Sequence, residues 1–430
     1  MFAERRQRFL DAIGPGVAVF PAAPVVIRNN DVEHEYRQDS DMQYLSGFEE
    51  PESVLVLSNR HPKHRSVLFV RPRDPDREVW DGPRAGVDGA VRDFGVDAAF
   101  PIAELDQRLP EYLEDVPRLH YRLMEDAAFD AHVFGAIQRI RGRKRSPARP
   151  PSEIVDPTVV LHEMRLHKSA DELRIMRRAI EVSRDAHLAA MRVALPGAYE
   201  YEVEAEILRV FRAGGSERPA YGSIVGSGPN ATVLHYRKND RRLADGDLLL
   251  IDAGCELEFY ASDITRTFPV NGRFSDPQKA LYEVVLESQL EAIAMTRPGV
   301  TLDAIHERVV RVITAGLLRL GLLEGDIEEA IRTEAYKPYY MHRTSHWLGM
   351  DVHDVGSYFA GAKPRPLEAD VVLTIEPGIY ISPSASVDAK WRGIGIRIED
   401  DVRVTTDGAE VMSHDVPKTV ADVEAALKNR

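Results

Sequence analysis

Cysteine is nearly absent from this sequence, since Cys255 is the only one among 430 residues. A single cysteine excludes an intramolecular disulfide and is typical of proteins from a reducing compartment. Long apolar runs are absent as well. No stretch approaches the roughly 18 consecutive apolar residues that span a membrane, and the N-terminus lacks the apolar segment of a signal peptide. We therefore expect a cytoplasmic protein that does not bind membranes.

Positively charged residues are fewer than negatively charged ones. The chain has 55 lysines and arginines against 69 aspartates and glutamates, a net charge of -14. Nucleic-acid binding depends on clustered positive charge, so we expect no nucleic-acid partner. One basic cluster does occur, within residues 139–149 beside Pro147, Pro150 and Pro151. Its composition favours a solvated linker or a surface between subunits, with an anion site as the alternative.

The length of 430 residues predicts two or three domains. Residues 1–165 mix short apolar runs with turn-rich segments, as a small α/β domain does. Ser169 followed by Glu172 forms a capping box, which predicts a helix that reaches about Val193. We place a domain boundary near residue 165, which gives domains 1–165 and 166–430.

The second domain contains a weak internal repeat. Its matching dipeptides flank amphipathic helices, and each copy is preceded by another long helix and followed by strands. We therefore predict two similar α+β halves related by a pseudo-twofold axis. The matching dipeptides lie 102 residues apart: Pro196-Gly197 and Pro298-Gly299, Arg209-Val210 and Arg311-Val312, Ala213-Gly214 and Ala315-Gly316.

Carboxylates end three apolar runs that are typical of buried strands. Asp252, Glu376 and Glu399 occupy these positions, and burying a charge is costly unless cations accompany it. Asp263 lies in a β-rich run that can pair antiparallel with 248–253, which would bring it beside Asp252. A turn cap or an arginine pair would explain any one of these acids. The presence of all four favours a metal site.

An imidazole would complete such a site, and His346 is the candidate. Four carboxylates with one imidazole suffice for two divalent ions that share a water, which becomes the nucleophile. A lone histidine is more often an ordinary polar residue, but His235, His342 and His353 also lie in apolar or glycine-rich contexts. A ligand set dominated by oxygen favours Mn²⁺, with Co²⁺, Zn²⁺ or Fe²⁺ able to substitute.

These motifs together resemble those of the pita-bread metallopeptidases, and most closely their Xaa-Pro aminopeptidase (aminopeptidase P) branch. The resemblance implies an α+β pita-bread catalytic domain with a pseudo-twofold repeat, preceded by a smaller α/β N-terminal domain. The metal-free creatinase branch shares the fold but lacks this ligand set. The resemblance covers nearly the whole chain and rests on Tyr36–Asp41, Tyr44–Phe48, Ile251–Gly254, Asp263–Thr267, Ser345–Gly349, Val352–Gly356, Ile375–Gly378 and Gly395–Asp400.

The resemblance also implies roles for individual residues. Two divalent ions per chain would be held by five ligands, and further residues would orient these ligands, move a proton or contact the substrate. Asp252 would bind one ion, His346 and Glu376 the other, and Asp263 and Glu399 would bridge them. Glu376 would shuttle a proton, Arg397 would orient a ligand, His235, His342 and His353 would contact the substrate, and Tyr380 and Trp80 would fit the proline ring.

The implied activity is hydrolysis of the N-terminal Xaa-Pro bond of peptides with proline in second position. Two alternatives stay open. A prolidase shares all five ligands but cleaves only dipeptides, and a non-catalytic pita-bread module would act by binding alone. A tripeptide and a dipeptide with proline second distinguish the peptidases. The resemblance further implies a homodimer or a homotetramer.

Overall fold

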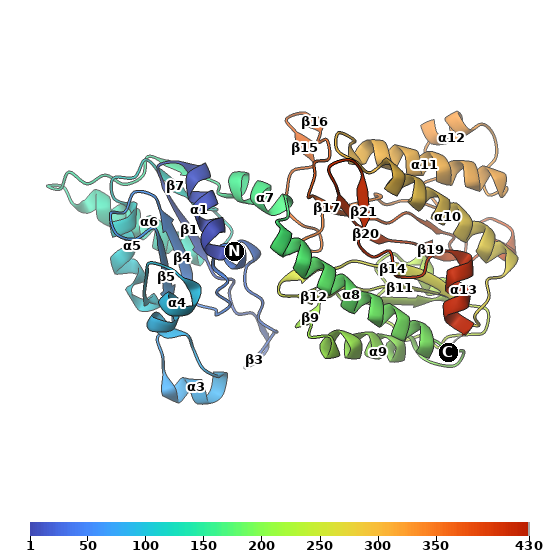
Figure 1. The fold of residues 1–430 in the computed structure, drawn as a ribbon, viewed down its shortest axis with the longest axis horizontal. Coiled ribbons are helices and arrows are strands. Elements are labelled where there is room, and N and C mark those ends of the chain that lie inside the picture. Colours follow the sequence, from blue (N-terminus) through green and yellow to red (C-terminus); the bar gives the residue numbers. More distant parts are fainter. Residues whose placement is uncertain (429–430) are drawn as a thin grey trace. The chain divides into compact units, whose positions relative to one another are not determined.

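The computed structural model describes residues 1–428. The chain divides into two compact units, Met1–Met164 and Arg165–Arg430, which Figure 1 draws in blue to cyan and in green to red. Among the described residues, no helix has both the length and the apolar character required to cross a membrane.

The first unit is built on a six-stranded mixed sheet with the order β6-β5-β4-β1-β7-β8. Its central strands are buried, apart from Pro21 at the end of one of them, because their valine- and leucine-rich sequences face helices on both sides of the sheet. The predicted strands within 17–20, 54–57 and 67–70 are confirmed. The strands are β1 (Val17–Pro21), β4 (Val54–Ser58), β5 (Ser66–Val70), β6 (Ala98–Pro101), β7 (Arg118–His120) and β8 (Glu153–Val155), with a separate hairpin of β2 (Ile27–Asn29) and β3 (Val32–Glu33).

Helices cover this sheet, and one of them contains part of the basic cluster. Arg139 and Arg141 lie in the last turn of α6 (Ala127–Gly142), where positive charge stabilises the helix dipole. Arg143 pairs with Glu114 in the same unit. Arg139 and Arg141 therefore belong to a helix and not to a linker, whereas residues 143–149 have no helix or strand and are largely exposed. The other helices are α1 (Phe2–Ile13), α2 (Ser40–Ser46), α3 (Pro75–Asp81), α4 (Gly86–Phe94), the 3-10 turn Ile102–Glu104, α5 (Leu105–Leu113) and α7 (Thr158–Leu166), which continues into the second unit.

The second unit repeats the order of two helices followed by strands. Helix α8 (Ala170–Val193) begins at the predicted capping box of Ser169 and packs on α9 (Glu200–Ala213). In the second half, α10 (Asp276–Met295) packs on α11 (Leu302–Arg319). The shorter helices are α12 (Ile327–Arg332) and α13 (Val420–Lys428).

Each half contributes one three-stranded antiparallel sheet to the centre of this unit. The first half contributes β10-β11-β14 and the second β17-β20-β21. The strands are β9 (Arg218–Pro219), β10 (Ile224–Ser227), β11 (Leu248–Asp252), β12 (Cys255–Leu257), β13 (Tyr260–Ala261), β14 (Thr265–Pro269), β15 (Phe359–Ala360), β16 (Lys363–Pro364), β17 (Val372–Ile375), β18 (Gly378–Tyr380), β19 (Gly395–Arg397), β20 (Asp400–Val404) and β21 (Ala409–Val411), with 3-10 turns at Gly228–Thr232 and Ala389–Trp391.

Polar contacts join the two halves where β14 meets the chain between β19 and β20. The backbone nitrogen of Glu399 donates to the carbonyl oxygen of Thr265 over 3.1 Å, and the hydroxyl of Thr267 donates to the carbonyl oxygen of Arg397 over 3.0 Å. The ends of the acid-bearing strands from both halves therefore lie together.

Candidate metal centre

Asp252 and Asp263 lie at the base of one antiparallel pair of strands. Strand β11 pairs with β14 so that Asp252 faces Thr265, which confirms the predicted pairing. Between the two aspartates the chain runs through β12 and β13. This path leaves no space for a side chain at Gly254. A Cβ atom there would lie 1.7 Å from the carbonyl oxygen of Ser262. Only glycine permits this close approach of backbone to backbone.

Glu376 and Glu399 are brought together in the same way in the second half. Strand β17 pairs antiparallel with β20, so that Ile375 faces Asp400. Glu376 directly follows one strand and Glu399 directly precedes the other. All three acid-bearing strand ends that the sequence singled out therefore lie at the junction of the two halves.

The ligating atoms of Asp263, His346 and Glu399 all lie within 4.8 Å of one another. Glu376 is adjacent, with Oε1 at 3.7 Å from Nε2 of His346, and Oδ2 of Asp263 lies 3.5 Å from the same nitrogen. Asp252 joins the group through Tyr221, whose hydroxyl contacts carboxylate oxygens of both Asp252 and Asp263. The structure thus gathers all five residues that were predicted as metal ligands.

These carboxylates lie so close together that their negative charges repel one another strongly. Burial, and then repulsion by Asp263, Glu376 and Asp252, raises the pKa of Glu399 well above its usual value. Burial also raises the pKa of Glu376 to about 7 and that of Asp252 above its usual value. The acids cannot all be ionised unless cations neutralise them. An oxygen-rich, electron-rich donor set of this kind fits divalent metal ions.

His346 is oriented toward the acids by its other ring nitrogen. Nδ1 lies 3.0 Å from the carbonyl oxygen of Trp347, so Nδ1 carries the proton and Nε2 faces the carboxylates. Burial alone would lower the pKa of His346, but its hydrogen bond with Asp263 and the charge of Glu376 outweigh burial and raise it to about 9. A cation beside Nε2 would replace that proton.

Arg397 is the guanidinium that borders the acids. It pairs with Asp252, and it donates to the hydroxyls of Thr265 over 3.1 Å and of Tyr380 over 3.0 Å. Its side chain is 5% exposed, and the charges of Tyr380 and Asp252 raise its pKa further although burial opposes this. One guanidinium cannot balance four carboxylates, which leaves room for added positive charge.

Three histidines surround the acid cluster. Nε2 of His342 lies 2.9 Å from the Tyr380 hydroxyl, and Nδ1 lies 3.8 Å from Glu376. Burial, and then Arg397, lowers the pKa of His342 to about 3. The ring of His353 meets that of His346 edge-on at 4.4 Å, and burial lowers its pKa below the usual value. Both imidazoles are therefore neutral at physiological pH.

His235 completes this group of histidines. Its charge is one of the smaller causes that lower the pKa of both His342 and His353, after burial, so it lies near both. Like His353 it is exposed, whereas His342 is half-buried. The structure thus brings together the three histidines that were predicted to contact the substrate.

A buried ion cluster holds the loop that carries His346 and His353. Asp354, whose side chain is 1% exposed, accepts from Lys168 over 3.0 Å and from Arg165 over 2.8 Å. The two cations lower its pKa although burial raises it. Gly349 lies against this carboxylate, since a Cβ there would meet Oδ2 of Asp354 at 2.0 Å.

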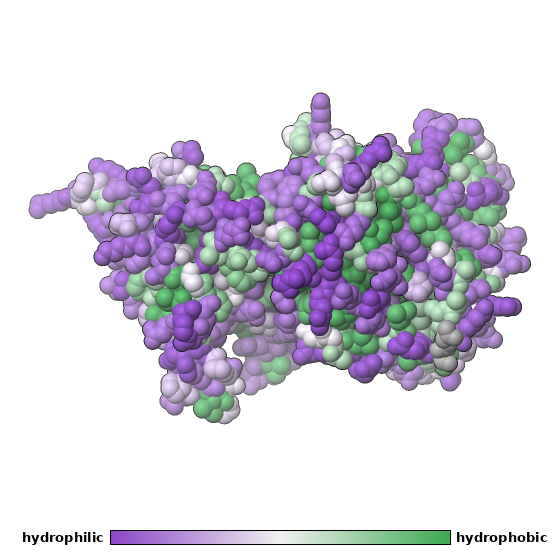
Figure 2. Space-filling model, viewed as in Figure 1, coloured by the Kyte–Doolittle hydropathy of each residue, from purple (hydrophilic) through white to green (hydrophobic). Residues whose placement is uncertain are grey.

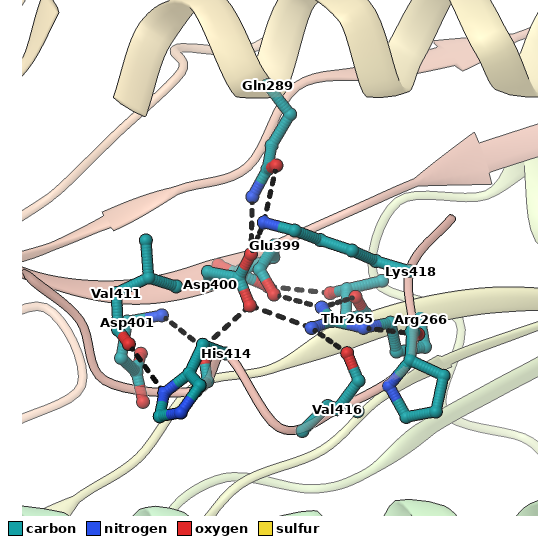
Figure 3. Close-up of polar contacts among 12 residues, drawn as sticks. Thr265, Arg266, Gln289, Glu399, Asp400, Asp401, Val411, His414, Val416 and Lys418 are labelled. Carbon is teal, nitrogen blue, oxygen red and sulfur yellow. Dashed lines mark hydrogen bonds and ion pairs between the residues drawn. The ribbon is translucent and has the colours of Figure 1, made fainter. Parts of the chain in front are cut away.

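A second buried network holds the backbone of Glu399 (Figure 3). The guanidinium of Arg266 donates to the carbonyl oxygen of Glu399 over 2.6 Å and to the carboxylate of Asp400 over 2.7 Å. The side chain of Lys418 also donates to Asp400, over 2.6 Å. Arg266 and Asp400 are both fully buried. The segment before α13 is thereby tied to the backbone of a predicted ligand.

Sequence reasoning missed several residues that shape this site. Tyr221 bridges two acids, Thr265 bonds Glu399, and the buried carboxylate of Asp401 accepts from the backbone nitrogen of Asp263 over 3.2 Å. A tyrosine or threonine near a strand end carries no signal of its own. Only the pairing of distant strands gives these side chains their partners.

Trp80 belongs to the other compact unit. It lies on α3, no residue of which is buried, and it is 85% exposed. Its neighbour Val79 is 81% exposed, and Figure 2 shows hydrophobic side chains at the tip where Figure 1 draws α3. Its predicted contact with substrate stays a prediction.

Comparison with known proteins identifies the family. Residues 174–406 match metallopeptidase family M24, and residues 2–120 match the aminopeptidase P N-terminal domain. The Xaa-Pro aminopeptidase of Escherichia coli (strain K12) is 45% identical over 428 residues, covering 99% of this chain and 97% of that relative. Human Xaa-Pro aminopeptidase 3 is 37% identical over 409 residues, covering 93% of this chain and 78% of the relative.

Solved structures support the same family. Pseudomonas aeruginosa aminopeptidase PepP superposes with a TM-score of 0.98 at 55% identity, over 100% of this chain and 97% of the other. Zinc-substituted Escherichia coli aminopeptidase P in complex with product has a TM-score of 0.96 at 44% identity, over 100% of this chain and 98% of the other. These likenesses confirm the predicted fold class, an α+β pita-bread domain preceded by a smaller α/β domain. The chain therefore belongs to metallopeptidase family M24 and carries an aminopeptidase P N-terminal domain.

Proposed function

We propose that this protein is an Xaa-Pro aminopeptidase, which hydrolyses the bond between the first residue of a peptide and a proline in second position. The observation that carries the proposal is the buried group of four carboxylates and His346 with Arg397 as the guanidinium beside it. Relatives with 45% and 37% identity bear the name Xaa-Pro aminopeptidase. These relatives match nearly the whole chain, including the N-terminal unit.

The two parts of the chain have separate tasks in this proposal. Residues 1–165 form the N-terminal domain, and residues 166–430 form the catalytic domain. The division into compact units at Met164 and Arg165 supports these limits, as do the family matches at 2–120 and 174–406. The proposed metal ligands, the proposed proton carrier and the proposed hydrogen-bond donors all belong to 166–430.

Two divalent ions per chain would be held by the five gathered ligands. Asp252 would bind one ion, His346 and Glu376 the other, and Asp263 and Glu399 would bridge them. When bound, the ions polarise the scissile carbonyl and activate the attacking water. Mn²⁺ is the proposed physiological ion because oxygen donors dominate, and Co²⁺ or Zn²⁺ could replace it.

The protein's own groups orient these ligands and move the proton. Tyr221 contacts one oxygen of Asp252 and Arg397 contacts the other, and the two contacts fix the orientation of this carboxylate. Glu376 lies between His346 and His342. It takes a proton from the attacking water and passes it to the departing proline nitrogen.

The three histidines recognise the reacting peptide bond. A neutral imidazole can donate one hydrogen bond to the carbonyl oxygen, where negative charge develops. His353 and His235 are the proposed donors, and His342 lies on the proline side. A bond before proline has no N–H group, so the site must fit the ring instead of binding that nitrogen.

Two aromatic residues have different parts in the proposal. Tyr380 is 2% exposed and its hydroxyl contacts both His342 and Arg397. We therefore assign it to the wall of the proline pocket and to the orientation of His342. Trp80 is the exposed aromatic proposed to contact the substrate. A homodimer or a homotetramer and a cytoplasmic location complete the proposal.

The experiment is metal analysis of the purified protein together with hydrolysis of Xaa-Pro-Yaa and Xaa-Pro peptides. We expect two divalent ions per chain, cleavage of the tripeptide, and loss of cleavage on chelation. Replacing Glu399 with Ala should lower metal content and turnover together, whereas Glu368→Ala at an exposed acid should change neither. Cleavage of the dipeptide alone would indicate a prolidase, and no cleavage with metal bound would indicate a binding module.

A further inference from the structure

Glu200 is a fully buried carboxylate outside the acid cluster. It is the first residue of α9 and has 0% exposure. Its oxygens accept from the backbone nitrogen of Ser227 over 2.7 Å and from that of Arg241 over 2.9 Å. The hydroxyls of Ser227 and Tyr236 donate to it over 2.6 and 2.8 Å. The side-chain amide of Asn230 adds a bond of 3.1 Å.

These donors come from both ends of one segment, residues 227–241. Ser227 and Asn230 lie at its start, and Tyr236 and Arg241 lie at its end. The backbone nitrogen of Glu200 also donates to the carbonyl oxygen of Arg241 over 3.0 Å. From 233 to 241 the segment has no helix or strand. Glu200 is therefore the clamp that closes this irregular loop.

His235 lies inside the clamped loop. Among residues 1–428 its imidazole makes no hydrogen bond, and it is exposed. Its neighbours Leu234 and Tyr236 pack against a buried apolar cluster that contains Leu250 and Tyr380. The contacts of the residues on either side of His235 therefore set the position of its imidazole. Tyr236 connects this stretch to Glu200 through its hydroxyl.

We propose that Glu200 and Tyr236 are positioning residues that hold His235 in its place beside the acid cluster. This inference rests on the proposed function, in which His235 contacts the scissile carbonyl. A positioned donor contributes only when it lies within hydrogen-bond distance of the developing charge. A loop without regular structure would not hold it there, because the ordering entropy must be offset by specific contacts.

The Tyr236→Phe variant is the more conservative test of the clamp. It keeps the packed ring and removes only the hydroxyl that Glu200 binds. Glu200→Gln removes more, because the amide nitrogen cannot accept the bonds that reach one carboxylate oxygen. Asp240→Ala is the matched control, since Asp240 is an exposed second partner of the Tyr236 hydroxyl at 3.2 Å.

The discriminating experiment is a double-mutant cycle with His235→Ala in the metal-loaded enzyme. We expect Tyr236→Phe to lower kcat/KM for an Xaa-Pro-Yaa peptide by roughly fivefold, the scale of one hydrogen bond, with metal content unchanged. In the His235→Ala background the same change should lower it by less than about twofold, because interacting residues are not additive. Asp240→Ala should behave as the parent does.

Hydrogen exchange gives a readout that needs no substrate. Tyr236→Phe and Glu200→Gln should raise exchange within 228–238 and leave β11 and β14 protected. Equal losses of kcat/KM in both backgrounds, or unchanged exchange in this segment, would overturn the positioning role. A parent enzyme that binds metal but does not cleave Xaa-Pro peptides would overturn the proposed function instead, while hydrogen exchange would still test the clamp.

Discussion

The hydroxyl of Thr265 donates a hydrogen bond of 2.6 Å to Oε2 of Glu399. The two residues come from different halves of the pita-bread domain, and Thr265 is fully buried. The same hydroxyl oxygen accepts from Nε of Arg397. One neutral side chain therefore orients one carboxylate oxygen of a proposed bridging ligand. Its neutrality matters, because a charged donor there would compete with a metal ion.

Thr265→Val should weaken metal binding. Valine has nearly the same shape but no hydroxyl, so Glu399 loses the bond that orients it. Loss of such an outer contact lowers metal affinity by about 10- to 100-fold. Competition with a chelator measures this affinity directly. Thr265→Ser keeps the hydroxyl and should bind metal nearly as the parent does, whereas equal affinity of the valine variant would exclude the orienting role.

His353→Ala should separate chemistry from metal binding. The imidazole contacts His346 only ring to ring, so its loss should leave metal content unchanged. Loss of a positioned donor lowers kcat/KM by about 10² or more. Kinetics, metal content and Tm of the one variant give the answer. His414→Ala, at an imidazole whose side chain is 70% exposed, is the control. A destabilised His353→Ala enzyme with parental turnover would remove His353 from the site.

The sequence predicted the acid cluster because its signals are local. An acid that ends an apolar run is visible at Asp252, Glu376 and Glu399 without any knowledge of the fold, and the capping box at Ser169 begins a helix where it was predicted. The pairing of Asp252 with the strand after Asp263 followed from the length of the intervening chain. Such features depend on neighbouring residues alone.

The supporting residues could not be predicted because their partners are distant in sequence. Glu200 lies among other acids at the start of α9, and only folding brings Ser227 and Arg241 to its carboxylate. Arg266 and Asp400 meet across 134 positions. The start of the basic segment, at Arg139 and Arg141, was mispredicted for the converse reason. Its local composition is typical of a linker, but its first arginines end a helix.

Lys418→Met should destabilise the catalytic domain. The ammonium and the guanidinium of Arg266 together lower the pKa of Asp400 although burial raises it. Removing the ammonium leaves one ion pair to offset the buried charge, and a bond to a charged group contributes about 2 kcal/mol. Tm should fall by roughly 5 °C. Lys279→Met, which breaks an exposed pair with Glu283 at 3.9 Å, should change Tm little.

That stabilisation has a defined pH range. Because Asp400 has a lowered pKa in the folded protein, its contribution is fully present above the unfolded value of about 3.9 and is lost as pH falls toward the folded value. The difference in Tm between the parent and Lys418→Met should therefore shrink in strong acid. A constant difference at all pH values would contradict the ion-pair account.

His187 should make stability depend on pH in a higher range. It is 1% exposed on α8 and its Nε2 donates to the carbonyl oxygen of Ala253 over 3.1 Å, next to the proposed ligand Asp252. Burial lowers its pKa to about 4 although that hydrogen bond opposes the shift. An unfolded histidine has a pKa of about 6.5. As pH falls from 6.5 toward 4, the unfolded chain therefore gains a proton that the folded protein does not.

The loss of stability over this range should reach about 3 kcal/mol and then stop, because below the folded pKa both states bind the proton. His187→Gln isolates the effect, since its amide can still donate to Ala253 but does not titrate. Plotted against pH, the Tm of the parent should fall relative to that of His187→Gln between about 6.5 and 4 and run parallel to it above 7. Parallel curves over the whole range would mean that His187 takes up its proton over the same pH range in the folded protein as in the unfolded chain. The backbone beside Asp252 would then tolerate a buried imidazolium.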